Sequence, residues 1–348
     1  MKRVGYLYEN ITSIDNLILA VKNATKNKKH RRGVVKDAHD NPERFALRVK
    51  EKFDNGTLYF STPYTKTRRE HNKIRNIKVP RFYPDQIVHW ALMQVIDPII
   101  NRGLYRYSCG SVKGRGTSGA RKAIQHFIRK DPRIKYVYKA DIHHFFDSID
   151  TDILKRKFRR VIKDAKVLRL IDAIIDIGGK GLPIGFYTSQ GFSNFYLQTF
   201  DHTVKEKLHI RHYARYADDI VFLDRNKRKL HKAHDTLGLV LRRGNLHVKS
   251  DWQIWRYGSR SIDFVGYRVY DGFTLLRKRI FYSLTRVVRK IKQFGLRLQQ
   301  CLRFISYIAR AKFINFKKYY LEKIKPIVSK GRAQKIVSLH ARTLGAAA

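Results

Sequence analysis

The chain has 348 residues, of which 43% are hydrophobic, so it can fold around one large core or two to three smaller ones. It carries 74 Lys and Arg against 28 Asp and Glu, and a formal net charge of +46 favours a polyanionic partner, above all nucleic acid. No apolar run approaches the roughly 20 residues of a membrane span, and the basic start is not followed by the apolar segment of a signal peptide. Cys109 and Cys301 are far apart and match no zinc spacing. We therefore expect a cytoplasmic protein without membrane contact.

The first third of the chain mixes helical and extended patterns. Residues 1–56 predict a helical and basic N-terminal extension. Residues 57–81 alternate β-branched, aromatic and basic residues, which predicts a solvated two-stranded hairpin. An apolar-periodic helix is expected over 85–100, ending near Pro98, and a glycine-rich loop that enters a helix over 108–128.

The middle of the chain alternates strands and helices. Asp150 is expected to cap the N-terminus of a helix, because its side chain can accept from the first backbone N–H groups. The expected elements are a strand at 135–142, a helix at 150–162, a loop and a long helix at 181–208, a hairpin around Asp218 and Asp219, a helix at 226–243 and a hairpin at 261–278.

The composition changes near the C-terminus. Residues 272–348 contain 19 Lys and Arg and one acid, Glu322. Apolar residues recur at helical spacing between Val287 and Ile308. This pattern predicts a small helical domain that packs one face and offers the other to phosphates.

Two adjacent carboxylates, Asp218 and Asp219, lie among apolar, aromatic and β-branched residues. Carboxylates this close repel each other, and a divalent cation relieves the repulsion. Asp141, near the end of the predicted strand at 135–142, would be the third hard oxygen ligand of the kind that suits Mg²⁺. Two ions about 3.5–4 Å apart can activate a 3′-hydroxyl and stabilise a departing pyrophosphate. An ordinary polar turn is the alternative for the aspartate pair.

The stretch Tyr216-Ala-Asp-Asp219 resembles the catalytic Tyr-x-Asp-Asp motif of reverse transcriptases. Other motifs of that family follow the right order between about residues 60 and 278. They are Arg75 in KIRNIKVP and the loop at 108–120 with Arg115 (fingers), Asp141 to Phe146 (first palm motif), Leu182 to Gln190 (nucleotide pocket) and Phe264-Val-Gly-Tyr267 (primer grip).

The resemblance implies an α+β right-hand polymerase fold, with fingers, a palm made of an antiparallel sheet and helices, and a basic helical thumb. The implied ranges are an N-terminal extension over 1–56, fingers over 57–134, palm over 135–272 and thumb over 273–348. The implied activity is RNA-directed DNA polymerisation.

The resemblance also assigns roles to single residues. Asp141, Asp218 and Asp219 would be catalytic ligands of two Mg²⁺ ions, with Mn²⁺ as a substitute. Phe146 would be the steric gate that excludes a 2′-hydroxyl, with core packing as the alternative. The remaining assignments are Arg75 and Lys73 near the triphosphate, Tyr216 near the primer end, Phe264, Gly266 and Tyr267 in the primer grip, Arg115 in the fingers, and Lys249 near the pyrophosphate, where a plain surface lysine is the alternative.

The nucleotide-pocket motif departs from the usual pattern. Ile184 precedes Gly185 where most reverse transcriptases carry glutamine, and Gln190 stands where proline is common. This pattern resembles the reverse transcriptases of diversity-generating retroelements, which copy a template-repeat RNA and misincorporate opposite its adenines. Isoleucine cannot form the hydrogen bond that an amide offers, a loss worth about 1–3 kcal/mol of discrimination. Neutral variation at position 184 in an accurate enzyme is the alternative.

The expected function is therefore synthesis of error-bearing cDNA for mutagenic retrohoming in a bacterial, archaeal or phage-encoded element. Its implied partners are template RNA, the primer or cDNA strand, deoxynucleoside triphosphates and a pentameric accessory variability determinant protein. Two alternatives stay open: a faithful reverse transcriptase of the group II intron or defence type, and a non-enzymatic basic RNA-binding protein on a polymerase scaffold.

Overall fold

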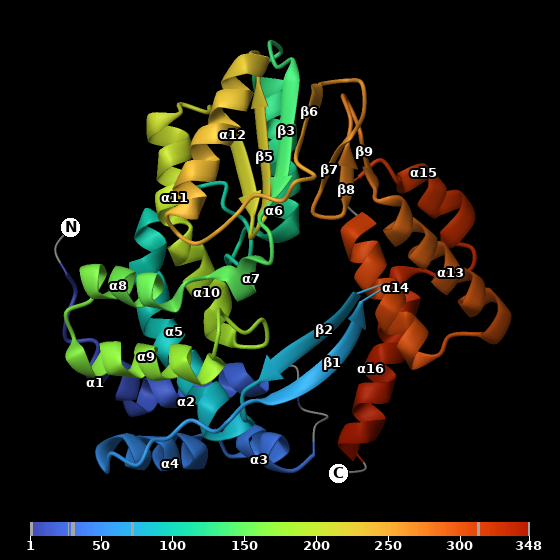
Figure 1. Cartoon of the computed structure of the whole chain (residues 1–348). Helices are drawn as coiled ribbons and strands as arrows, with labels where there is room; N and C mark the ends of the chain where they lie inside the picture. Colours follow the sequence, from blue (N-terminus) through green and yellow to red (C-terminus); the bar gives the residue numbers. More distant parts are fainter. Residues whose placement is uncertain (1–2, 27, 29–31, 71–72, 312–313, 347–348) are drawn as a thin grey trace. The chain divides into compact units, whose positions relative to one another are not determined.

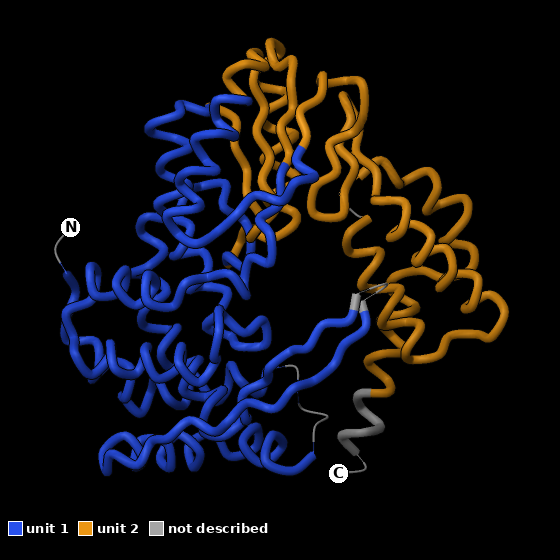
Figure 2. The backbone as a smooth tube through the Cα atoms, viewed as in Figure 1, with its two compact units in different colours: residues 1–112, 140–210, 231–252 blue, residues 113–139, 211–230, 253–348 orange. Residues whose placement is uncertain are grey.

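The computed structural model describes residues 3–26, 28, 32–70, 73–311 and 314–346 (Figure 1). The chain forms two compact units, one made of residues 1–112, 140–210 and 231–252 and the other of residues 113–139, 211–230 and 253–348 (Figure 2). These borders differ from the four ranges expected from the sequence, so the division into fingers, palm and thumb stays a prediction. Among the described residues, none of the helices is both long and apolar enough to cross a membrane.

The first unit is built around helix α5, whose two sides pack against α2 and α10. Nine of its 14 residues are buried. The helices of this unit are α1 (Tyr8–Thr12), α2 (Ile14–Thr25), α3 (Val34–Asp40), α4 (Pro42–Asp54), η1 (Phe82–Gln86), α5 (Ile87–Ile100), η2 (Asn101–Gly103), α7 (Phe145–Ser148), α8 (Thr151–Val161), α9 (Ala165–Gly178), α10 (Tyr187–Tyr196), α11 (Gln198–His202) and η3 (Thr203–Lys207). Helix α12 (Lys227–Arg242) begins in the second unit and continues in the first.

One predicted helix ends where the sequence places its end, and another is interrupted. Helix α5 ends at Ile100, two residues after Pro98, as predicted, and a proline in the last turn removes only one helical hydrogen bond. The long helix expected within 181–208 is broken at Leu197. There the ammonium of Lys157 donates to the Tyr196 carbonyl at 2.6 Å, which occupies an acceptor that a continuous helix would use. Asp150 caps α8 as predicted, since its side chain accepts from the backbone N–H of Ile153.

The first unit also contains the predicted solvated hairpin. Strands β1 (Tyr64–Glu70) and β2 (Lys73–Val79) pair antiparallel over seven residues each. Most of the described side chains of this hairpin are exposed, and five of the exposed ones are basic: Lys66, Arg68, Arg69, Arg75 and Lys78.

The second unit contains two antiparallel sheets. A four-stranded sheet has the order β4-β5-β3-β6, with β3 (Tyr136–Asp141), β4 (His212–Tyr216), β5 (Asp219–Asp224) and β6 (Gln253–Arg256). The last two residues of β3 belong to the first unit. Helix α6 (Gly116–Lys130) packs against β4. The hairpin expected at 261–278 is a three-stranded sheet of β7 (Ile262–Phe264), β8 (Tyr267–Val269) and β9 (Thr274–Leu276).

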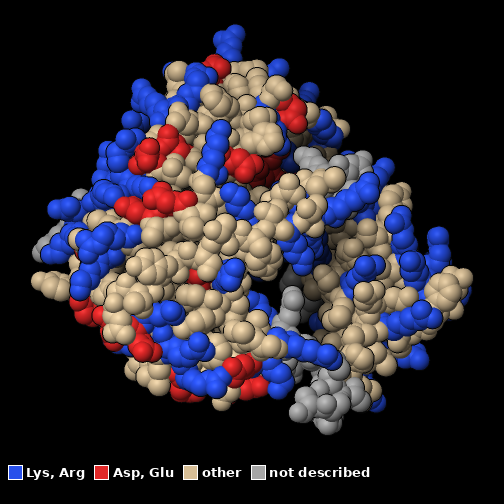
Figure 3. All heavy atoms as spheres, turned by 60° about the horizontal axis from the view of Figure 1, so that its bottom comes forward, with Lys and Arg blue, Asp and Glu red and all other residues tan. Residues whose placement is uncertain are grey.

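The C-terminal part of the second unit is helical, as the apolar spacing predicts. Its helices are α13 (Lys278–Phe294), α14 (Leu298–Ala311), α15 (Lys317–Tyr319), η4 (Tyr320–Ile324) and α16 (Lys330–Ala346). Leu284, Ile291 and Phe304 form part of an apolar core that also includes Tyr267 and Leu276 of the small sheet. Lysine and arginine side chains are spread widely over the face shown in Figure 3, whereas acidic side chains form small groups.

Candidate active site

The two adjacent aspartates lie at the turn of the β4–β5 hairpin. Tyr216 pairs with Asp219, which leaves Ala217 and Asp218 as the two turn residues. Ala217 has a φ of +52°, a left-handed conformation that costs a non-glycine residue free energy. The fully buried guanidinium of Arg215 donates to the Ala217 carbonyl at 3.0 Å and so helps to hold the turn. Asp218 therefore occupies the tip of the hairpin, and Asp219 begins β5.

Strand β3 lies between β5 and β6 and ends at Asp141. The N–H of Lys135 donates to the Asp224 carbonyl at 3.2 Å, and the ammonium of Lys139 lies 3.7 Å from a carboxylate oxygen of Asp219. The beginning of β3 is thus beside the end of β5, and its later part is beside the beginning of β5. β3 and β5 therefore run antiparallel.

The end of β3 also pairs with a segment outside the four-stranded sheet. Its carbonyl accepts from the N–H of Lys249 at 2.9 Å, and Ile142 forms an antiparallel bridge with Val248. The segment that carries Lys249 therefore runs beside the end of β3. The role of Lys249 near a pyrophosphate stays a prediction.

Phe146 lies in the short helix α7 and is half-buried, whereas its neighbour Phe145 is buried. The carbonyl of Phe146 accepts from the N–H of Leu182 at 2.8 Å. Gly181 has a φ of +70°, and a Cβ at this position would lie 2.5 Å from the same carbonyl oxygen. The beginning of the nucleotide-pocket motif thus packs directly on the backbone of Phe146.

The middle of the nucleotide-pocket motif packs on strand β2. A Cβ added to Gly185 would lie 2.1 Å from the carbonyl oxygen of Lys78, and the ammonium of Lys78 donates to the carbonyl of Gly178 at 2.9 Å. The adjacent Ile184 is 36% exposed. Arg75, which lies on the same strand, is exposed. Lys73 is the first residue of β2, and its side chain is outside the described part of the structure.

The end of the nucleotide-pocket motif is held from two sides. Ser111 donates to the side-chain carbonyl of Gln190 at 2.9 Å, which joins the glycine-rich loop to α10. The ring of Tyr187 stacks on Trp90 of α5, with centroids 3.7 Å apart. Burial, with a contribution from the Asp97 carboxylate, raises the pKa of Tyr187 to about 12, so its phenol stays neutral. Arg115 is half-buried in the second unit, immediately before α6.

The predicted primer-grip residues form the tight turn between β7 and β8. Val265 and Gly266 occupy the turn with φ angles of +47° and +88°. Phe264 and Tyr267 are buried, and the phenol of Tyr267 donates to the carbonyl of Arg310 at 3.2 Å. The side chains of Phe264 and Tyr267 therefore support the turn from within, whereas Val265 and Gly266 are half-buried.

A metal site is not assembled among the side chains that the structure describes, because no three or more His, Cys, Asp or Glu are grouped so that they could hold an ion. The carboxylate donors at the end of β3 and the start of β5 are nevertheless of the hard oxygen type that Mg²⁺ prefers. Two residues near them were not predicted from the sequence, Lys139 and Arg215. Both are charged residues inside apolar strands, and this was the signal that could have identified them.

Comparisons with known proteins show the family and the fold of the chain. The model of the reverse transcriptase (RNA-dependent DNA polymerase) family matches residues 66–269, more than half of the chain. Protein YkfC of Escherichia coli (strain K12) is 23% identical over 270 residues, which cover 65% of this chain and 69% of YkfC. The apo telomerase of Candida tropicalis superposes with a TM-score of 0.52 at 14% identity, over 83% of this chain and 64% of that one. The chain thus spans less than two thirds of that telomerase, and the likeness confirms the predicted α+β right-hand polymerase fold.

Proposed function

Because this chain belongs to the reverse transcriptase family of RNA-dependent DNA polymerases, we propose that it copies a template-repeat RNA into cDNA and makes errors opposite template adenines. The cDNA would then replace a variable region of a target gene, which is the mutagenic retrohoming of a diversity-generating retroelement. The enzyme class follows from the family. The retroelement type rests on Ile184, Gly185 and Gln190 in the nucleotide-pocket motif.

The observation that carries the polymerase mechanism is the antiparallel pairing of β3 with β5. It supports a site in which Asp141, Asp218 and Asp219 together hold two Mg²⁺ ions, or Mn²⁺ in their place. When bound, the ions supply activation of the primer 3′-hydroxyl and stabilisation of the pyrophosphate. Lys139 would limit the repulsion between the carboxylates, because its ammonium already lies 3.7 Å from Asp219.

The nucleotide would be selected by the residues around Phe146. Its half-buried ring would lie under the deoxyribose and exclude a 2′-hydroxyl, and the hydrogen bond from Leu182 would keep its backbone in place. Exposed Arg75, together with Lys73, would neutralise the triphosphate from β2. Lys249 would act near the pyrophosphate from the segment beside Asp141.

Base selection would be weakened at Ile184. A side chain that is partly exposed and apolar offers the incoming base pair no hydrogen bond. The side-chain carbonyl of Gln190 accepts from Ser111, which ties this amide to the glycine-rich loop.

The primer strand would pass the backbone of the turn at Val265 and Gly266, with Tyr216 near its end. Arg115 would act in the fingers. The further partners would be template RNA, deoxynucleoside triphosphates and a pentameric accessory variability determinant protein, in the cytoplasm. A net charge of +46 supports extended contact with structured RNA.

Sequencing of the cDNA tests the proposal. The full chain, with and without the accessory protein, is given an RNA that contains all four bases, and errors are counted opposite each base. Asp218→Ala serves as the inactive blank, and Asp251→Ala, which removes an exposed aspartate outside the site, serves as the matched control. We expect errors concentrated opposite adenine, and fewer of them in Ile184→Gln.

The other outcomes separate the alternatives. Low and even errors would reject the retroelement type and leave a faithful reverse transcriptase of the group II intron or defence type. If wild type and Asp251→Ala synthesise no cDNA under any primer, metal or partner condition, the protein is an RNA-binding scaffold.

A further inference from the structure

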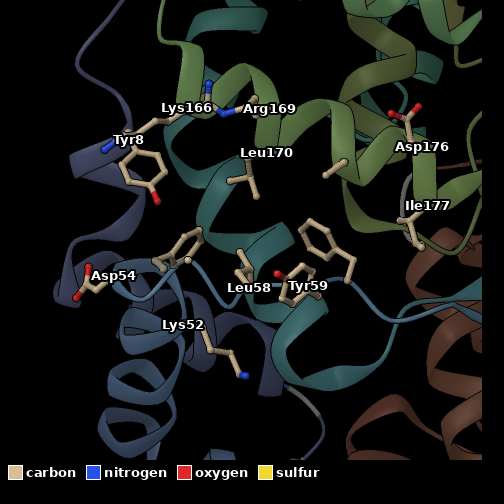
Figure 4. Close-up of a pocket in the computed structure, with 14 residues that line it drawn as sticks. Tyr8, Lys52, Asp54, Leu58, Tyr59, Lys166, Arg169, Leu170, Asp176 and Ile177 are labelled. Atoms are coloured by element: carbon tan, nitrogen blue, oxygen red, sulfur yellow. The ribbon is translucent and has the colours of Figure 1, made fainter.

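A separate cavity of about 740 Å³ opens in the first unit between α1, the end of α4 with the loop that follows it, and α9 (Figure 4). Its walls come from Tyr8, from residues 52–60 and from residues 166–177. None of these residues belongs to the motifs at 141–146, 182–190 or 216–219. The volume falls within the roughly 300–1,000 Å³ that is usual for small-ligand sites.

The cavity offers aromatic surface to a ligand. Phe53 and Tyr8 meet edge to face, with ring centroids 6.0 Å apart, and form a fixed wall. Tyr59 belongs to the loop after α4, is 78% exposed and lies on the side of the cavity opposite Leu170 of α9 (Figure 4). A flat ring that is open to solvent above an apolar wall is the arrangement on which a planar base stacks.

The charges of the cavity favour an anion. Its two carboxylates are neutralised by lysines that do not line it: Asp54 pairs with Lys50 at 2.6 Å and Asp176 pairs with Lys155 at 2.5 Å. Its own three cations form no ion pair within the described part of the chain; they are Lys52, Lys166 and Arg169. The lining therefore keeps a positive excess beside the aromatic surface.

We propose that this cavity binds one unstacked nucleotide of single-stranded RNA, with the base against Tyr59 and the neighbouring phosphates on Lys166 and Arg169. The inference rests on the proposed function, because the RNA would be a segment of the template transcript held outside the polymerase site. Stacking is tolerant of sequence, and phosphate contacts add a salt-dependent attraction. An acidic peptide would satisfy the cations but would leave the exposed ring without a stacking partner.

Cross-linking tests the site directly. The full chain carrying Asp218→Ala is mixed with a 12-nucleotide single-stranded RNA that contains 4-thiouridine, irradiated, and mapped by mass spectrometry. We expect cross-links within residues 52–60 or 166–177. Binding of the same RNA is measured by fluorescence anisotropy over a range of salt concentrations.

Matched variants are added to that background. Tyr59→Ala should lose the cross-links and weaken binding by about 5- to 150-fold, while Tyr59→Phe keeps both. Tyr64→Ala, which removes a ring that is 56% exposed on β1, should behave like the unmodified background. Lys166→Gln combined with Arg169→Gln should reduce the slope of log K against log salt by about 1.4.

The inference is overturned if the cross-links map elsewhere, if Tyr59→Ala binds as the background does, or if polyglutamate but not RNA occupies the cavity. Because the readouts need no DNA synthesis, they stay valid if wild type makes no cDNA. That result would reject the proposed function alone.

Discussion

Gly185 provides a direct test of the packing between the nucleotide-pocket motif and β2. Substitution by alanine would place a Cβ 2.1 Å from the Lys78 carbonyl oxygen and 2.7 Å from a methyl group of Ile77. Gly185 has no left-handed φ, so the cost is steric and not conformational. The carbonyl is fixed by the pairing of β2 with β1 and cannot rotate away as a flexible side chain would.

The magnitude follows from the overlap. Carbon and oxygen atoms need well over 3 Å, so the loop and the strand must separate by about an ångström, and overpacking of this kind costs about 1–3 kcal/mol. At about 1.4 kcal/mol per tenfold change, a cost borne by the nucleotide-bound state raises KM for the nucleotide about 5- to 150-fold. A cost borne by the fold as a whole lowers the free energy of unfolding by the same 1–3 kcal/mol.

Two assays on the same protein separate these cases, namely single-nucleotide incorporation kinetics and urea unfolding. Gly331→Ala is the control, because a Cβ at Gly331 meets no heavy atom within 4 Å. Wild-type KM together with wild-type unfolding free energy in Gly185→Ala would refute the packing argument.

Three further substitutions have defined outcomes. Phe146→Ala should lower discrimination against ribonucleotides at least about tenfold in competition assays, and unchanged discrimination would show that the ring only packs. Burial lowers the pKa of His89 to about 3, so the neutral ring contributes stability above about pH 6.5 that is lost as the pH falls. At pH 5 that loss is about 2 kcal/mol, and His89→Phe should remove it in urea unfolding, whereas an equal acid sensitivity in both proteins would contradict this. Burial raises the pKa of Asp85 to about 6. The protonated carboxyl therefore adds to the free energy of unfolding below about pH 4, and this stability is lost as the pH rises through 6. Asp85→Asn should therefore be up to about 3 kcal/mol more stable than wild type at pH 7.5 but not at pH 4, and an equal difference at both values would refute the assignment.

The parts of the fold that the sequence predicted are those encoded by local patterns. The hairpin with Asp218 at its tip follows from two short apolar strands around a polar pair, and the end of β3 at Asp141 follows from an apolar run that stops. The break at Leu197 depends instead on Lys157, which is about 40 residues away in the chain. The periodicity of apolar residues and the helix propensity of the segment contain no information about such a partner. The contact between Gly185 and β2 was hidden for the same reason, because glycine gives no sign of which atom approaches it.

The nucleotide-pocket motif combines fixed and adjustable positions. It is held at its start by the Phe146 carbonyl, in its middle by the contact of Gly185 with β2, and at its end by the hydrogen bond between Ser111 and Gln190. Ile184 lies within these anchors with a third of its side chain exposed, so a change of residue there requires little repacking. In the proposed nucleotide site, the hydrogen bonding at position 184 can therefore change while the backbone stays in place. Ile184→Gln should therefore alter the error spectrum while the free energy of unfolding changes by less than about 1 kcal/mol. A substitution at Gly185, by contrast, would also destabilise the fold, because its side chain would collide with β2.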